Sequence, residues 1–387
     1  MSAGSRVLMV ITSMARGGAE RQVVDLAAGL TRRGWEVRVV SMLPPRDFQA
    51  ELATAGVGLV SLDMRRGRPT VAALRRYRSV VRGWHPDIVH SHMVHANLLA
   101  RLGRVLVPAV PLVCTIHNVN EGPRWRELAY RVTDPLASSN TAVSRVAAER
   151  FQRVGAVPRG RITYLPNGHT FGDWGVSEIE RQRLRADLGV SPDAFLWLAV
   201  GRLMPAKGHD VLLEALARVA LRRPDVRAVI AGEGPERAAL SARTAALGLA
   251  GTATLLGERR DVPALLSAAD AFVMSSRWEG LPIALLEAAA HGLPIVSTDA
   301  GGSRDVVDPE SGGVLVGTSA DSLAAGMLSV MEWSPAERAH AGLTLRAHAK
   351  AEFDLDLVLD RWEVLYQALL EMPADRWHGS RRSGVRA

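Results

Sequence analysis

Short apolar runs alternate with helical segments along almost the whole chain, and this alternation restricts the fold more than any other feature. Residues 6–14, 111–118 and 195–200 are runs of this kind, and each is followed by a turn and a helical segment. Strands that alternate with helices pair in parallel, so the pattern predicts an α/β protein with parallel sheets. The pattern fills both halves of the 387 residues, a length that suits two domains. Ligands bind beside the carboxyl ends of such strands, so we expect the active site among these loops, in a cleft between the domains.

The composition restricts the class of protein further. Hydrophobic residues make up 48% of the chain, enough for two cores. The single cysteine, Cys114, excludes a disulfide framework, and its place in an apolar run indicates a buried strand residue. We expect neither a secretory signal nor a membrane-spanning helix, because the apolar runs fall short of the roughly 18–20 residues that a span requires. We therefore expect a cytoplasmic protein.

The charge is divided unevenly between the two halves. Residues 1–170 contain 24 basic and 11 acidic residues, a net charge of +13, whereas residues 171–387 contain 23 and 29, a net charge of −6. A basic half favours an anionic partner such as nucleic acid, an anionic membrane or an acidic acceptor. An alternative is that the basic composition only improves solubility.

Residues 276–305 hold the most specific pattern, which predicts a loop, a helix, a strand and a loop. Pro282 fits the first turn of the helix, and Gly292 ends it. Glu279 therefore lies in the loop before the helix, and Glu287 lies about a turn and a half into it. Carboxylates accept hydrogen bonds from hydroxyl groups, which sugars and riboses offer in pairs. Either acid could instead be an ordinary helix charge, although this suits Glu287 less because its helix is otherwise apolar.

The loop 201–208 carries two cations between the strand 195–200 and the helix 209–221. Arg202 and Lys207 are close enough in the sequence to converge on one diphosphate, the arginine as a fork and the lysine as a point charge. The chain has two lysines against 45 arginines, which suggests that a compact ammonium group is required at this position. The alternative is a pair of exposed loop cations.

The strand-end loops of the first half offer further candidates. Gly17 and Gly18 lie at a strand-to-helix turn, where backbone N–H groups suit a phosphate. The glycine spacing of a dinucleotide-binding fold is absent, which argues against a dehydrogenase. His117 comes at the carboxyl end of the strand 111–118. A plain tight turn and a hydrogen-bonded strand-end histidine are the alternative interpretations.

A cationic face is predicted on the helix that ends near Trp84. Its apolar residues recur every three to four positions, and the arginines fall largely off that stripe. An ordinary surface helix and a helix that contacts anionic lipid headgroups both fit this pattern. The arginines concerned are Arg75, Arg76, Arg78 and Arg82.

The pattern Glu279-x7-Glu287 and its surroundings resemble the family 4 retaining glycosyltransferases, which have two Rossmann-like domains facing a central cleft, the GT-B fold. The resemblance covers nearly the whole chain and is strongest in residues 196–305. The sequence Gly-Gly-Ala-Glu-Arg after the first strand is also a recurring opening of these enzymes. The chain departs from the family at Asn118, where Asp is usual, and at 169–170, where Val-Asp is frequent.

The resemblance implies a metal-independent reaction without a cofactor, in which a sugar leaves a nucleotide diphosphate with retention of configuration. Arg202 and Lys207 would offset the charge on the departing diphosphate. Glu287 would hold the ribose hydroxyls, Glu279 the sugar hydroxyls, and His117 would orient the sugar. Further residues expected at the substrate are Gly17, Gly18, Asp261, Gly280, Leu281 and Pro282.

The resemblance also implies the roles of the domains. We expect an acceptor-binding domain over 1–170, a nucleotide-sugar-binding domain over 171–354, a helix over 355–372 that crosses back onto the first domain, and a basic tail over 373–387. UDP is the default nucleotide, and GDP is the alternative. The basic first domain favours a lipid-linked or envelope glycan precursor as the acceptor, and a peripheral position of the protein on the inner face of the cell membrane is the alternative to a purely cytoplasmic one. The alternatives are a nucleotide-sugar epimerase of similar fold and a nucleic-acid-binding protein, for which no binding motif is present.

Overall fold

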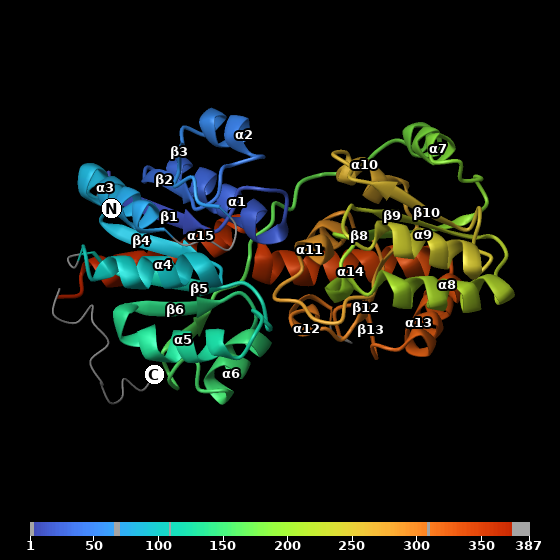
Figure 1. Ribbon diagram of the computed structural model, residues 1–387. Coiled ribbons are helices and arrows are strands. Elements are labelled where there is room, and N and C mark those ends of the chain that lie inside the picture. The colour runs from blue at the N-terminus through green and yellow to red at the C-terminus, as the bar shows by residue number, and fades with distance from the viewer. Residues whose placement is uncertain (1–3, 66–69, 108–109, 308–309, 374–387) are drawn as a thin grey trace. The chain divides into compact units, whose positions relative to one another are not determined.

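The structure is a computed structural model of the chain that describes residues 4–65, 70–107, 110–307 and 310–373 (Figure 1). The chain divides into two compact units. The first unit is formed by Met1–Gly168 together with Leu355–Ala387, and the second by His169–Asp354. No helix in the described ranges is both long enough and apolar enough to cross a membrane.

The first unit is built on a parallel sheet of seven strands in the order β3-β2-β1-β4-β5-β6-β7. The strands are β1 (Arg6–Ile11), β2 (Glu36–Ser41), β3 (Gly58–Ser61), β4 (Ile88–His92), β5 (Leu112–Ile116), β6 (Ser139–Ala142) and β7 (Ile162–Tyr164). The helices are α1 (Gly18–Arg32), α2 (Gln49–Thr54), α3 (Val71–Trp84), α4 (Val94–Arg104), α5 (Trp125–Thr133), α6 (Arg145–Arg153) and α15 (Leu355–Leu370), and a 3-10 turn, η1 (Asp134–Leu136), follows α5.

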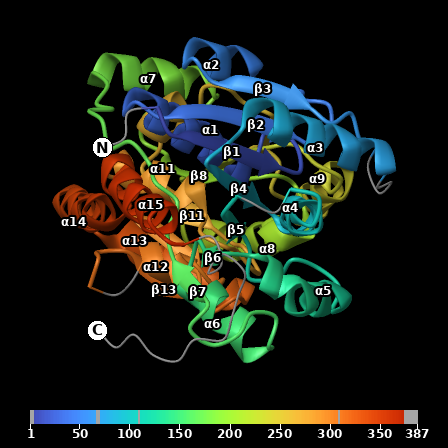
Figure 2. The same cartoon turned by 90° about the vertical axis from the view of Figure 1, so that its left-hand side faces the viewer.

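Strand β1 explains how helices cover both faces of this sheet. Side chains alternate between the two faces of a strand, and β1 is apolar at every position after Arg6. Val7 and Met9 join a core with α1 and α15, whereas Leu8 and Val10 join a second core with α3 and α4. In Figure 2, where this unit faces the viewer, the red α15 lies to the left of the strands and α3, α4 and α5 lie to the right.

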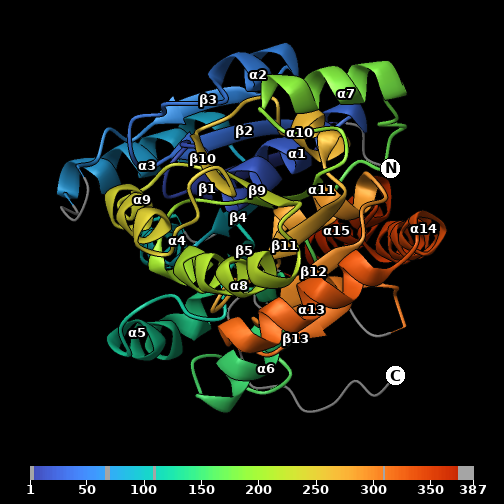
Figure 3. The same ribbon diagram turned by 90° about the vertical axis from the view of Figure 1, so that its right-hand side faces the viewer.

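The second unit is built on a parallel sheet of six strands in the order β10-β9-β8-β11-β12-β13 (Figure 3). The strands are β8 (Phe195–Val200), β9 (Val226–Ala231), β10 (Ala253–Gly257), β11 (Ala271–Met274), β12 (Ile295–Thr298) and β13 (Val314–Val316). The helices are α7 (Glu178–Asp187), α8 (His209–Arg222), α9 (Arg237–Ala246), α10 (Val262–Ala268), α11 (Ile283–Ala290), α12 (Ser303–Val306), α13 (Ala320–Glu332) and α14 (Pro335–Phe353), and η2 (Pro205–Lys207) is a 3-10 turn.

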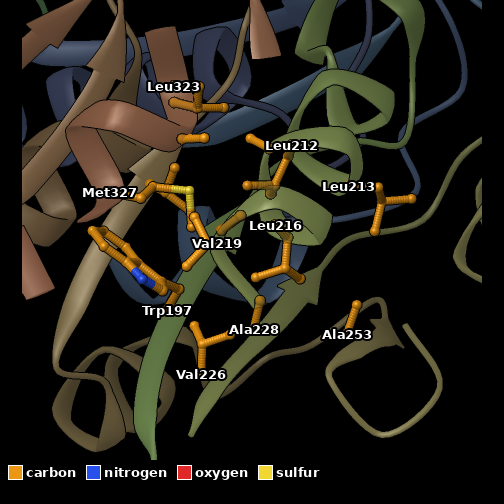
Figure 4. Packing of buried hydrophobic residues seen from close by; sticks show 14 of the residues in the cluster. Trp197, Leu212, Leu213, Leu216, Val219, Val226, Ala228, Ala253, Leu323 and Met327 are labelled. Atoms are coloured by element: carbon orange, nitrogen blue, oxygen red, sulfur yellow. The ribbon is translucent and has the colours of Figure 1, made fainter. Parts of the chain in front are cut away.

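The core of the second unit lies between the sheet and the helices α8 and α13. Trp197 of β8 is fully buried and packs in one cluster with Leu212 and Leu216 of α8 and Met327 of α13 (Figure 4). These residues fix α8 directly after the loop that leaves β8. The core therefore determines where that loop and its cations lie.

In both sheets the order in which successive strands are added reverses at the first strand of the unit. In the first sheet β1 lies between β2 and β4, and in the second β8 lies between β9 and β11. Loops that leave neighbouring strands in opposite directions open a crevice at the carboxyl edge, which is where α/β sheets bind ligands. The loops after β1, β8 and β11 carry most of the predicted site residues, whereas His117 follows β5 and Asp261 follows β10.

The sequence also predicts helices over residues 21–34, 124–136 and 171–190, and each of the three differs in part from the structure. The helix predicted from Arg21 begins at Gly18, because Gly17 is extended and its carbonyl oxygen accepts a hydrogen bond from the N–H of Arg21 at 2.9 Å. The polar segment 171–190 is helical only in α7. The helix predicted over 124–136 is α5 followed by the tighter turn η1, where Pro135 cannot supply the N–H that α5 would need.

Candidate active site

The loops after β8, β9 and β11 pack against one another backbone to backbone. Gly208 has a φ of +60°, and a Cβ there would overlap the carbonyl oxygen of Ser275. Gly232 has a φ of +157°, and a Cβ there would overlap the carbonyl oxygen of Gly201. Only glycine allows these close approaches, so the shape of the crevice beside β8 depends on two residues that have no side chain.

Lys207 and Glu279 form an ion pair at this crevice. The Nζ atom of Lys207 lies 2.6 Å from Oε1 of Glu279, and the hydroxyl of Ser276 donates to the same oxygen at 2.6 Å. Glu279 is 8% exposed, so its charge is largely removed from water. A buried carboxylate requires such partners, because an unpaired one would lose its hydration without compensation.

The backbone around Glu279 is held by the next strand along the sheet. Its N–H donates to the carbonyl oxygen of Ala300 at 2.9 Å, and the hydroxyl of Thr298 donates to the carbonyl oxygen of Ser276 at 2.6 Å. The pair therefore ties together the loops that follow β8, β11 and β12. Its second carboxylate oxygen and the remaining ammonium protons can bind a ligand that has both hydroxyls and anionic oxygens.

Arg202 and Glu287 lie on the two elements that flank this pair. Arg202 is exposed in the loop after β8, five residues before Lys207. Glu287 is half-buried and is the fifth residue of α11, whose other residues are almost all buried. Its place on α11 agrees with the turn and a half predicted from the sequence.

The remaining predicted residues of the second unit occupy two loops. Gly280, Leu281 and Pro282 are buried between Glu279 and α11. Asp261 is the residue before α10, and it accepts a hydrogen bond from Nε of Arg259 at 2.7 Å. The Arg259 guanidinium lowers the pKa of Asp261, which is therefore ionised and paired within its own loop.

In the first unit His117 directly follows β5 and is bound to a second histidine. Its Nε2 lies 3.1 Å from Nδ1 of His92, the last residue of β4. Burial lowers the pKa of His117 to about 4 and that of His92 well below its ordinary value, so both rings are neutral at pH 7. His117 can therefore orient a ligand through a hydrogen bond but carries no positive charge there.

The buried side of His92 indicates which ring donates. Its Nε2 is buried and finds no hydrogen-bond partner within the described part of the chain. A buried lone pair without a partner costs less than a buried N–H without one, so the proton of His92 belongs on Nδ1. His117 then accepts the hydrogen bond from His92 at its Nε2. Its own proton lies on Nδ1, and this N–H group can donate a hydrogen bond to a sugar hydroxyl.

The predicted glycines at α1 have an acid beside them that the sequence analysis missed. The carboxylate of Glu20 lies next to Gly17, and its Oε1 accepts a hydrogen bond from Ser13 at 2.8 Å. Gly18 is exposed and begins α1. The position of Glu20, three residues after the residue that caps the helix, is typical of an acid that folds back onto a helix N-terminus and could have revealed it.

Two family models match the chain. The model described as "Glycosyl transferases group 1" matches residues 180–342, and the model described as "Glycosyltransferase Family 4" matches residues 16–170. The chain is 31% identical over 395 residues to a D-inositol 3-phosphate glycosyltransferase of Geodermatophilus obscurus, covering 92% of this chain and 85% of that relative. The chain belongs to the group 1, or family 4, glycosyltransferases, which are transferases of EC class 2.4.

Further similarities agree with this family. The chain is 30% identical over 239 residues to a GDP-mannose-dependent monoacylated alpha-(1-6)-phosphatidylinositol monomannoside mannosyltransferase of Corynebacterium glutamicum, and the match covers 59% of this chain and 61% of that relative, less than two thirds of its length. Anabaena HepE, solved in complex with UDP-glucose, has a TM-score of 0.83 and 23% identity, covering 94% of this chain and 99% of that chain. The likeness to HepE shows the fold, which is the GT-B type with two Rossmann-like units.

Proposed function

We propose that the protein transfers a sugar from a nucleotide-diphosphate sugar to a lipid-linked or envelope glycan precursor, with retention of the sugar's configuration. The observation that carries this proposal is the Lys207–Glu279 pair beside Arg202, at the place where the strand order of the second sheet reverses. Two cations and a buried acid within one set of loops suit a diphosphate that is joined to a sugar. We assign the second unit to the donor and the first to the acceptor.

The roles of the residues follow from their surroundings. Lys207 and Arg202 offset the negative charge that grows on the diphosphate as the bond to the sugar breaks. Glu279, already held by Ser276, accepts hydroxyls of the sugar through its other oxygen, and Glu287 accepts those of the ribose. The acceptor oxygen bonds to the anomeric carbon on the face that the phosphate leaves, and the acceptor proton passes to that phosphate.

The first unit supplies the remaining proposed contacts. His117 is neutral and orients the sugar by donating a hydrogen bond to it. The N–H groups at Gly17 and Gly18 donate hydrogen bonds to a phosphate after the Glu20 carboxylate has moved away from Gly17.

Of the four arginines predicted to form a cationic face, Arg75 and Arg82 of α3 are exposed, so their charges are available to an anionic headgroup or acceptor. Arg76 instead pairs with Asp63, and Arg78 is half-buried. We propose a peripheral position at a membrane on this basis.

UDP is the proposed nucleotide, and GDP is the second candidate. The relatives divide on this point, since HepE was solved with UDP-glucose and the Corynebacterium enzyme is named for GDP-mannose. A nucleotide-sugar epimerase and a nucleic-acid-binding protein are not favoured, because the relatives reported above are named as glycosyltransferases.

A thermal-shift panel of UDP, GDP, ADP and NAD tests the proposal. A ligand at about 100 times its dissociation constant adds roughly 2.7 kcal/mol to stability. We expect one nucleoside diphosphate to stabilise the wild type and to lose most of that effect with Glu287→Ala. The matched control is Glu214→Ala on α8, which is outside the proposed site. A response to NAD alone, or to none of the four, would contradict the proposal.

A further inference from the structure

The turn that carries Lys207 is bound along its length by the loop that follows β11. The hydroxyl of Ser275 donates to the carbonyl oxygen of Lys207 at 2.9 Å. The N–H of Arg277 donates to the carbonyl oxygen of Ala206 at 2.8 Å. Gly208 ends the turn, and a Cβ there would overlap the carbonyl oxygen of Ser275. The loop after β11 therefore determines where the backbone of Lys207 lies.

The side chain of Arg277 adds a second set of bonds to the same turn. Its Nη1 and Nη2 atoms donate to the two carboxylate oxygens of Asp210, at 2.9 and 2.6 Å. Nη1 also donates to the carbonyl oxygen of Pro205 at 2.8 Å. Pro205 begins η2 and Asp210 is the second residue of α8, so one guanidinium group binds both ends of the turn. A bidentate pair of arginine and carboxylate also fixes the orientation of its two partners, which a single hydrogen bond does not.

These bonds restrict where the Lys207 ammonium group can lie. A lysine side chain has many rotamers and loses conformational entropy when it is held in one of them. Because the backbone of Lys207 is fixed, fewer rotamers remain, and the one observed places Nζ 2.6 Å from Oε1 of Glu279. Arg277 lies two residues before Glu279, so the segment that fixes the lysine also carries the acid. The Arg277–Asp210 pair therefore controls the geometry of the Lys207–Glu279 pair.

Arg277 is poorly suited to bind a phosphate itself. Both hydrogens of Nη1 are engaged, and Asp210 compensates the charge of the guanidinium group. Asp210 raises the pKa of Arg277, and the carboxylates of Glu236 and Glu214 act in the same direction. An anion that approached Arg277 would meet these three acids as well as the cation. Any contribution of Arg277 to a diphosphate site therefore passes through Lys207.

We propose that Arg277 and Asp210 are positioning residues of the donor site, which hold η2 so that the Lys207 ammonium group meets the departing diphosphate in a fixed place. The inference rests on the proposed function, because that function assigns the diphosphate to Lys207. Charges that are already in place stabilise a transition state without reorienting. Without the pair, Lys207 keeps its charge but occupies more positions, so the preference for a diphosphate over a monophosphate falls.

Two substitutions separate positioning from a direct effect of charge. Arg277→Gln removes a cation, whereas Asp210→Asn removes an anion and keeps the shape of the side chain. If the pair acted through its charges alone, the first would weaken diphosphate binding and the second would strengthen it. If the pair positions Lys207, both substitutions weaken it.

Calorimetric titration of the full chain with UDP and UMP, or with GDP and GMP if the wild type responds to GDP, measures the preference for the diphosphate. We expect Arg277→Gln and Asp210→Asn each to reduce that preference at least about threefold. A result in which either variant keeps or increases the preference overturns the proposal. An unfolding transition in urea shows that each variant is folded.

A double-mutant cycle with Lys207→Gln tests whether Arg277 acts through the lysine. In the Lys207→Gln protein no ammonium group remains to be positioned. We therefore expect the further change Arg277→Gln to alter the affinity for the diphosphate by less than about twofold there. Losses that add in the double variant would show that Arg277 acts independently of Lys207, and they overturn the proposal.

Arg223→Gln is the matched control. The guanidinium group of Arg223 also forms a bidentate pair, with Asp225 at 3.0 and 2.7 Å, and it donates to the carbonyl oxygen of Met331 at 3.1 Å. This pair lies directly before β9, at the sheet edge opposite to the loops of the site, so we expect the wild-type preference. A loss equal to that of Arg277→Gln would reflect any lost ion pair and overturns the proposal.

The same titrations distinguish a failure of this inference from a failure of the proposed function. A wild type that does not prefer the diphosphate contradicts the proposed donor site, and the inference falls with it. A wild-type preference that Lys207→Gln removes, but that Arg277→Gln and Asp210→Asn leave intact, overturns the inference alone.

Discussion

The side chains of Lys207 and Glu279 meet at 2.6 Å although 72 residues separate them in the sequence. The pair gives the crevice beside β8 a cation and an anion that are each held in place before a ligand arrives. Pre-organised charges stabilise a transition state without having to reorient when the reaction occurs. The donor site we propose is built around this pair.

Glu279→Gln separates the effect of the Glu279 charge on nucleotide binding from its effect on the rate of sugar transfer. The amide keeps the volume and can still accept from Ser276, but it removes a negative charge next to the proposed diphosphate. We expect the affinity for the nucleoside diphosphate to stay equal or rise, and the rate of transfer to fall at least about tenfold, a loss of about 1.4 kcal/mol of transition-state stabilisation. Calorimetric titration and a transfer assay measure the two quantities. Weaker binding with an unchanged rate would contradict the proposed role.

Gly232→Ala tests the backbone packing under the site. The added Cβ would overlap the carbonyl oxygen of Gly201, and the φ of +157° is strained for alanine. We expect a loss of at least about 3 kcal/mol in the free energy of unfolding. Gly248→Ala is the control, since Gly248 has a φ of +68° and open space around it, and should cost about 1–2 kcal/mol. Equal losses in urea unfolding would show that the loop packing contributes nothing.

The histidines of the first unit predict a loss of stability in mild acid. Burial keeps the pKa of His117 at about 4, whereas an unfolded histidine titrates near 6.5. The unfolded chain therefore binds protons first, so stability is full above about pH 6.5 and falls as the pH drops toward about 4. Burial also lowers the pKa values of His90 and His92, so these two histidines likewise make the folded state less stable as the pH falls.

A comparison with His117→Asn isolates this effect. Burial raises the pKa of Glu121 to about 7, and this group changes stability in the opposite direction over the same range. Both proteins contain Glu121, so its contribution cancels in the difference. We expect the melting temperature of the variant to fall less steeply than that of the wild type between pH 6.5 and 4. Parallel curves would contradict the lowered pKa of His117.

Glu20→Gln tests whether an anion binds at the start of α1. The carboxylate of Glu20 lies beside Gly17, where the proposed phosphate would be placed. Removing that charge should strengthen phosphate binding, so we expect the affinity for the intact nucleotide sugar to rise about two- to fivefold, or roughly 0.4–1 kcal/mol. Glu36→Gln, at an exposed acid of β2, is the control. An equal affinity in the wild type, Glu20→Gln and Glu36→Gln would show that no phosphate binds at Gly17 and Gly18.

The order of strands and helices could largely be predicted from the sequence, because buried parallel strands are continuous apolar runs. The α/β class with parallel sheets was confirmed, and so was membership of the family that Glu279 and Glu287 indicated. Short elements were missed: α2 has six residues and β7 has three, too few for a periodic pattern. The sheet and its neighbours determine these segments rather than their own residues.

The pairings within the site could not be predicted. The bond of Lys207 to Glu279 joins loops that follow different strands, and that of His92 to His117 joins the end of β4 to the residue after β5. The geometry of both bonds depends on the order of strands in the sheet. Glu20 was the exception, since its spacing from Gly17 is a local signal. The roles that the family resemblance implies for Asp261, Gly280 and the other site residues stay predictions.

The most direct test of the donor site compares a nucleoside diphosphate with the matching monophosphate by calorimetric titration. Three proteins are needed: the wild type, Lys207→Gln, and Lys350→Gln, which changes the chain's other lysine, an exposed residue of α14. We predict that the wild type and Lys350→Gln prefer the diphosphate by at least about tenfold, or about 1.4 kcal/mol, and that Lys207→Gln loses most of this preference. If all three proteins keep the same preference, Lys207 does not bind the diphosphate and the proposed site is wrong.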